Sequence, residues 1–154
     1  MSKNHSYTIT TENNKSEKEA INFLLESDSK FLLPDNIGRK KILEFLGIEK
    51  KFIRAFDLVI VQGHKSLDEI IYLKNSQDIV LVELKTTKKN LPLLPKGFFF
   101  GATENEFELA NKLGDNYKFC FVSLHEKSKN YVLLNLNELN KIIRNKRIQF
   151  QINL

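Results

Sequence analysis

The pattern of hydrophobic and polar positions predicts two helices in the first third of the chain. Apolar residues recur at the spacing of an amphipathic helix in 16–26 and again in 37–46. The first segment begins with Ser16-Glu17-Lys18-Glu19, which has the form of a capping box, and the second ends before Gly47. Both segments are therefore expected to be short helices that precede a sheet.

Extended segments dominate the rest of the chain. Residues 56–61 and 78–85 are apolar and rich in β-branched side chains, which favours strands. Thr103-Glu104-Asn105-Glu106 is a second capping box, and it predicts a helix that Gly114 ends. The remaining predicted strands are 69–73, 98–100, 117–123, 131–134 and 147–153, with a helix at 136–144. The pattern predicts an α/β (α+β) domain in which helices flank a central mixed β-sheet.

Length and composition limit the organisation of the chain. A chain of 154 residues with 42% hydrophobic content fits a single domain, expected at 15–154. Residues 1–14 are polar, so they are expected to form a disordered lead-in without the apolar core of a signal peptide. No apolar run reaches the length of a membrane span. The single cysteine, Cys120, is expected to be a buried thiol, and together these features favour a cytoplasmic protein.

The candidate chemistry lies at the end of the strand 79–85. Its first residues are apolar on both faces, which is typical of a strand in the middle of a covered sheet. Glu83 and Lys85 then follow two residues apart, and so on the same face. Asp57 opens the neighbouring strand, where pairing would bring it beside Glu83. Because charges are costly to bury without partners, this arrangement predicts a cleft at the edge of the sheet.

This set of charges suits a magnesium site. Two close carboxylates repel each other unless a cation lies between them, and Mg²⁺ binds one or two carboxylates together with water and phosphate oxygens. The amine of Lys85 could orient the attacking water and stabilise developing charge. The alternative for the Glu83/Lys85 pair taken alone is an ordinary salt bridge, so the prediction depends on the combination with Asp57.

These segments resemble a known nuclease superfamily. The stretch Phe56-Asp57-Leu58-Val59-Ile60, followed by the strand that ends in Glu83-Leu84-Lys85, is similar to the core of the PD-(D/E)XK superfamily. The continuation Gly97 to Glu106 is similar to its NO VEIN C-terminal-like branch and to small restriction endonucleases. The resemblance covers about residues 54–123, with Phe56 in place of the proline of the family pattern. It implies a restriction-endonuclease-like core.

The resemblance also implies roles for individual residues. Asp57 and Glu83 would bind the metal together with the backbone carbonyl of Leu84, and Lys85 would assist the nucleophile. The net charge of +5 suits a polyanionic partner. Three lysines that follow the strand, Lys88, Lys89 and Lys96, would contact DNA phosphates beside such a site. A second basic cluster near the C-terminus is expected to be a solvated surface, and it consists of Lys141, Arg144, Lys146 and Arg147.

Three further glutamates are candidates for an additional carboxylate at the metal. Glu106 lies on the apolar side of its predicted helix, although its place in the capping box is the simpler interpretation. Glu19 has the same capping explanation, and Glu44 lies on the polar side of its helix. His64 and His125 are expected to be loop residues without a catalytic role.

The sequence therefore predicts a Mg²⁺-dependent DNA endonuclease. A role in restriction is favoured over a role in repair, because the chain carries no helicase or other processing module. A single site cuts one strand, so a homodimer or a partner subunit would be needed for double-strand cleavage. The main alternative is a non-catalytic DNA-binding or assembly subunit that has the nuclease fold. A plain α/β interaction domain is a third possibility, which the resemblance disfavours.

Overall fold

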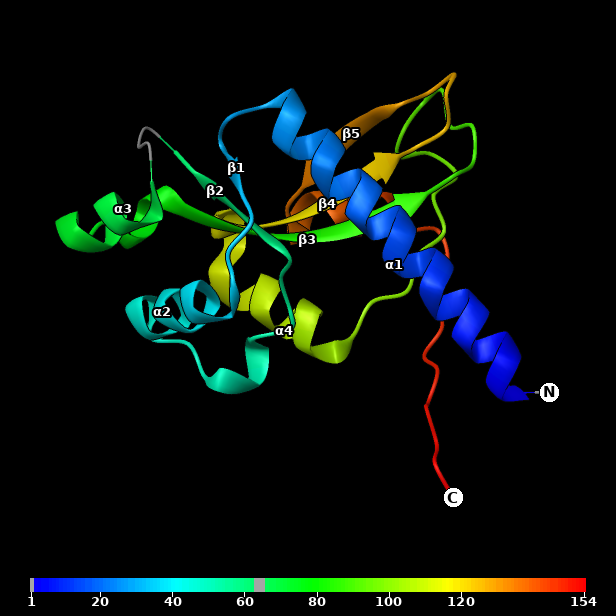
Figure 1. Ribbon diagram of the computed structural model, residues 1–154, viewed down its shortest axis with the longest axis horizontal. Coiled ribbons are helices and arrows are strands. Elements are labelled where there is room, and N and C mark those ends of the chain that lie inside the picture. Colours follow the sequence, from blue (N-terminus) through cyan, green and yellow to red (C-terminus); the bar gives the residue numbers. More distant parts are fainter. Residues whose placement is uncertain (1, 63–65) are drawn as a thin grey trace.

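The computed structural model describes residues 2–62 and 66–154, and its centre is a mixed five-stranded sheet in the order β1-β2-β3-β4-β5 with helices on both faces (Figure 1). The strands are β1 (Phe31–Leu32), β2 (Leu58–Val61), β3 (Ile79–Thr87), β4 (Tyr117–Ser123) and β5 (Asn130–Leu134). The α-helices are α1 (Ser2–Ser27), α2 (Asn36–Leu46), α3 (Leu67–Leu73), α4 (Glu104–Leu113) and α5 (Leu136–Ile142). Short 3-10 turns form η1 (Lys50–Phe52), η2 (Ser76–Asp78) and η3 (Gly114–Asn116).

The strand that carries the candidate residues lies at the centre of the sheet, as its sequence predicts. β3 pairs with β2 in antiparallel and with β4 in parallel orientation, and β4 pairs with β5 in antiparallel orientation. The parallel pair is joined through α4, because parallel neighbours need a long crossover connection. The predicted mixed sheet flanked by helices is therefore confirmed.

The two faces of the sheet have separate cores. On one face, alternate strand residues such as Val59 and Leu81 pack with α2, α4 and α5 through Leu43, Leu109 and Leu139. On the other face, the intervening strand residues pack against Ala20 and Leu24 of α1, which crosses the sheet in Figure 1. β2, β3 and β4 are buried on both faces over most of their length, which explains why these strands are continuous apolar runs in the sequence.

The helix ends confirm two of the predicted signals. α2 ends at Gly47, whose φ of 66° lies in the left-handed region that favours glycine. At the start of α4, the hydroxyl of Thr103 accepts from the amide of Glu106, while the Glu106 side chain accepts from the amide of Thr103. This capping box fixes where α4 begins, which becomes important at the candidate site.

The first helix is longer than the sequence predicts. α1 includes residues that were expected to form the lead-in 1–14, and Ser16 lies inside the helix instead of at its N-cap. A capping sequence indicates only a local preference for a helix start. The buried side chains of Ala20 and Leu24 hold α1 against the sheet, and this packing does not depend on where the helix begins.

Three predicted strands are wrong. Residues 69–73 belong to α3, because Ser66 caps its start by accepting from the amide of Glu69. Residues 98–100 form no strand, and Phe98 and Phe100 instead pack their rings on Phe121, with centroids 5.0 Å apart in each pair. Residues 147–153 also form no strand, and the apolar side chains of this segment are exposed.

Two further predictions concern Cys120 and membrane-spanning segments. Cys120 is fully buried in β4, and burial raises the pKa of its thiol to about 12. Within the described ranges, no helix combines the length and the apolar character needed to cross a membrane.

Candidate active site

Asp57 is held at the start of β2 by backbone contacts. Its amide donates to the carbonyl of Val82 at 2.8 Å, and its Oδ2 atom accepts from the amide of Leu84 at 2.8 Å. Arg39 of α2 fixes the turn before β2 by donating to the carbonyl oxygens of Phe56 (2.6 Å) and Asp57 (3.2 Å). These contacts place the Asp57 carboxylate beside the end of β3, as the sequence predicts.

Glu83 and Lys85 lie on the face of β3 that α4 covers. Their positions alternate with those of Val82 and Leu84, which pack on the α1 side. The Lys85 amine lies 3.3 Å from Oε1 of Glu83, and their side chains are only 11% and 10% exposed. The pair is therefore largely removed from water, unlike an ordinary surface salt bridge.

Glu106 joins this pair from the first turn of α4. Its Oε1 atom lies 2.5 Å from the Lys85 amine, and its Oε2 atom accepts from the hydroxyl of Thr103 at 2.7 Å. The predicted capping role is thus present, but the same carboxylate also binds Lys85. Capping is therefore confirmed for Glu106, while its role as an additional carboxylate at the metal stays a prediction, and the oxygen that does not cap the helix contacts Lys85.

Glu17 is a fourth acid at the site, and sequence reasoning missed it. It lies on α1, and its carboxyl interacts directly with Asp57. Burial raises the pKa of Glu17 first, and the negative charge of Asp57 raises it further, while Arg39 and Lys85 oppose both effects. A signal was available, since Glu17 precedes the buried Ala20 and Leu24 at the three- and seven-residue spacing of one helix face.

Glu83 is the most perturbed carboxyl of the group. Burial and then the negative charge of Asp57 raise the pKa of Glu83 to about 10, with Lys85 opposing and Glu106 adding to the rise. Its Oε2 atom is buried and has no hydrogen-bond partner among the described residues. The raised pKa favours the protonated form of this carboxyl at neutral pH.

The residues present fit a hard divalent cation. The partnerless oxygen of Glu83 and the repulsion from Asp57 are both relieved by a positive charge, and these two carboxyl groups offer the oxygen ligands that such an ion prefers. Among residues 2–62 and 66–154, no three acidic, imidazole or thiol side chains form a ready-made metal cage. Mg²⁺ does not require one, because water and phosphate oxygens commonly complete its shell.

The backbone of Leu84 contributes two groups beside Asp57 and Glu83. Its amide donates to Asp57, while its carbonyl is the atom that the family resemblance assigns to the metal.

The predicted basic residues Lys88, Lys89 and Lys96 are exposed and follow β3 in the loop that leads to α4. Lys88 comes three residues after Lys85, which is about 10 Å of extended chain. The loop is anchored where the Leu91 amide donates to the Ser128 hydroxyl at 3.0 Å.

The remaining candidates lie away from this cluster. Glu19 and Glu44 have exposed side chains on α1 and α2. His125 lies in the connection between β4 and β5, where its Nδ1 atom accepts from the amide of Lys127 at 3.1 Å. His64 lies outside the described residues.

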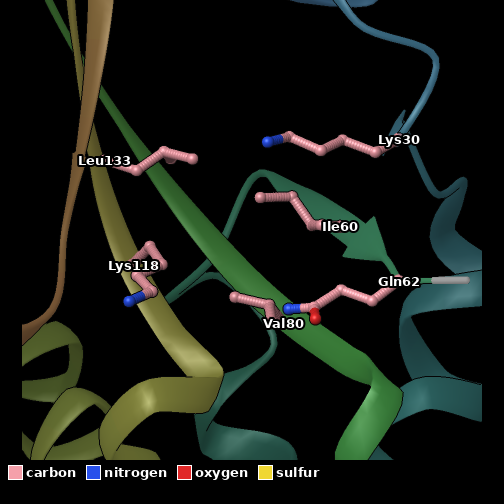
Figure 2. Close-up of a pocket in the computed structure, with 6 residues that line it drawn as sticks. All are labelled: Lys30, Ile60, Gln62, Val80, Lys118 and Leu133. Atoms are coloured by element: carbon pink, nitrogen blue, oxygen red, sulfur yellow. The ribbon is translucent and has the colours of Figure 1, made fainter.

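A separate hollow of about 480 Å³ lies on the α1 side of the sheet. Figure 2 shows its lining, with Lys30 and Lys118 on opposite sides of an apolar floor that includes Val80. The Lys30 amine lies 3.5 Å from Oδ2 of Asp28, and the Lys118 amine lies 3.9 Å from Oε1 of Glu138. None of the clustered acids lines this hollow, so the candidate site is distinct from it.

Comparisons of the chain with protein-family models, with curated proteins and with solved structures found no match.

Proposed function

We propose that this chain is a Mg²⁺-dependent DNA endonuclease of the PD-(D/E)XK class and of the restriction type. The observation that carries the proposal is the buried, partnerless Oε2 atom of Glu83, with the Asp57 carboxylate and the Lys85 amine as its neighbours. A buried acid with a strongly raised pKa beside a second acid is typical of functional sites. The oxygen lacks a positive partner, and a metal ion would supply one.

Asp57 and Glu83 would hold the ion through their carboxylates, and Leu84 would contribute its backbone carbonyl. When bound, Mg²⁺ lowers the pKa of a coordinated water and neutralises charge on a phosphodiester. Glu83 must lose its proton to bind the ion, so occupancy of the site depends on pH.

Lys85 acts on the reacting atoms in this proposal. Its ammonium group orients the water whose oxygen forms the new bond to phosphorus, and it stabilises the negative charge that develops there. The attacking water releases a proton to solvent as the bond from phosphorus to the leaving oxygen breaks, and the leaving oxygen takes up a proton from solvent. The slight exposure of the Lys85 side chain, 11%, limits competition from bulk water.

DNA would approach along the loop that follows β3. Lys88, Lys89 and Lys96 are exposed there, so they are available to neutralise backbone phosphates. The described residues of each copy contain one such cluster of acids, and cutting both strands would require a homodimer or a partner subunit.

A plasmid-cleavage assay with Mg²⁺ and with EDTA tests the proposal. The wild-type protein is expected to nick or linearise plasmid only with Mg²⁺, and Glu83→Gln is expected to be inactive. Glu126→Gln is the matched control, because Glu126 is exposed in the connection between β4 and β5. Mg²⁺-independent binding of DNA without cleavage by the wild-type protein would instead support the non-catalytic subunit.

A further inference from the structure

The Lys85 amine has two carboxylate partners, and the closer one is not on its own strand. It lies 2.5 Å from Oε1 of Glu106 and 3.3 Å from Oε1 of Glu83. The Glu106 side chain is only 6% exposed. A short ion pair that is withdrawn from water fixes an ammonium group more strongly than a solvated one does.

The Glu106 carboxylate is itself fixed by the start of α4. Its Oε2 atom accepts from the amide of Thr103 at 3.1 Å and from the Thr103 hydroxyl at 2.7 Å. Neither oxygen can move away without breaking the capping box or releasing Lys85. The position of the amine is therefore linked to the N-terminus of the helix.

Capping alone does not explain these contacts. The chain has a second capping box at the start of α5, where Asn135 is the N-cap and Glu138 stands at the same helix position as Glu106. Glu138 makes the equivalent contact to the Asn135 amide at 3.0 Å, yet its side chain is 49% exposed. The amine of its neighbour Lys118 lies 3.9 Å from Oε1 of Glu138. The burial of Glu106 and its short contact with Lys85 thus exceed what a capping box requires.

We infer that Glu106 is a positioning residue, which holds the Lys85 amine in place for the reaction. The inference rests on the proposed function. Glu83 is assigned to the metal in the proposed function, and its contact with the Lys85 amine is the longer of the two, at 3.3 Å. Glu106 has no such competing role, because its other oxygen faces Thr103. It therefore keeps the amine beside the reacting atoms throughout turnover.

The substitution Glu106→Gln separates positioning from capping. Glutamine serves at this position of a capping box, so α4 should keep its start while the charge that holds Lys85 is lost. Glu138→Gln is the matched control, since it makes the same change at the same helix position away from Lys85. The variants Glu106→Ala and Glu138→Ala also remove the side chain that completes each capping box, so comparing them with the Gln variants gives the effect of losing the cap.

Two measurements on the full chain provide the test. In nitrogen–proton NMR spectra of the metal-free protein, the Lys85 ammonium signal should be visible in the wild type and in Glu138→Gln, because hydrogen-bonded ammonium protons exchange slowly. It should be lost or shifted in Glu106→Gln. In single-turnover cleavage at saturating Mg²⁺, the rate of Glu106→Gln should fall about tenfold or more, as expected for a displaced reacting group.

An unchanged ammonium signal in Glu106→Gln, or a wild-type cleavage rate in that variant, would overturn the inference. A wild-type protein without any Mg²⁺-dependent cleavage would count against the proposed function instead. In that case the NMR comparison would still decide whether Glu106 holds the amine.

Discussion

The backbone amide of Leu84 donates a hydrogen bond of 2.8 Å to Oδ2 of Asp57, 27 residues earlier in the chain. β2 begins only at Leu58, so this side-chain contact holds the chain beside β3 just before the β2–β3 pairing begins. The chain itself thus fixes Asp57 beside Glu83, and no cation is needed to bring the two together. In the metal-free protein, burial and the charge of Asp57 raise the pKa of Glu83 to about 10, and a proton on Glu83 relieves the repulsion.

The stability of the metal-free protein should fall as pH rises. Folding raises the pKa of Glu83 from an ordinary value of 4.5 to about 10, so between these values the folded state holds a proton that the unfolded state has released. Rising pH therefore favours unfolding, by at most about 1.4 kcal/mol per pH unit. Thermal unfolding in EDTA should show this slope for the wild type. A variant Glu83→Gln with the same slope as the wild type would contradict the assignment.

Binding of Mg²⁺ near neutral pH should release a proton. Because Glu83 is protonated in the metal-free protein, the ion must displace that proton to reach its carboxylate. Calorimetric titration in buffers of different ionisation enthalpy should report about one proton released per ion, and the affinity should increase with pH. Binding of Mg²⁺ without proton release would show that the ion does not bind to the Glu83 carboxylate.

Removing the Glu17 carboxylate should weaken Mg²⁺ binding without preventing folding. The Glu17 carboxyl lies beside Asp57 and can take a negative charge when a cation binds, whereas glutamine cannot, so Glu17→Gln should lower the affinity for the ion by about tenfold, the equivalent of about 1.4 kcal/mol. Glu19→Gln is the matched control, because Glu19 is exposed on the same helix. Equal affinities for the two variants would exclude a role for Glu17.

Reversing the charge of the loop after β3 should weaken DNA binding. Changing Lys88, Lys89 and Lys96 together to Glu removes contacts with phosphates, so the slope of log affinity against log salt concentration should become shallower. Changing Lys40, Lys41 and Lys50 to Glu gives the same change in net charge at exposed positions on α2 and η1. If both triple variants keep the wild-type slope, the loop is only a solvated surface.

Much of the fold follows from local patterns. The continuous apolar run of β3 predicts its central place, and Gly47 and Thr103 predict the end of α2 and the start of α4. The failures arose where another signal decided the structure. Residues 69–73 have strand-like composition, yet the cap at Ser66 starts a helix there.

The candidate site was predicted only in part. Asp57, Glu83 and Lys85 were found because strand alternation and pairing bring them together in a way that a sequence pattern reveals. Glu17 and Arg39 reach the site from helices, and their contribution depends on how those helices pack against the sheet. Helix packing leaves a weaker trace in the sequence than strand pairing does.

The most direct test of the central claim is the single-turnover cleavage rate of Lys85→Ala at saturating Mg²⁺. Glu83 should hold the metal and Lys85 should act on the water, so this variant should keep Mg²⁺ affinity while losing the chemical step. The expected fall in rate is about a hundredfold or more, as is usual when a positioned charge or proton-transfer group is removed. A Lys85→Ala protein that cuts DNA at the wild-type rate would contradict the proposed mechanism.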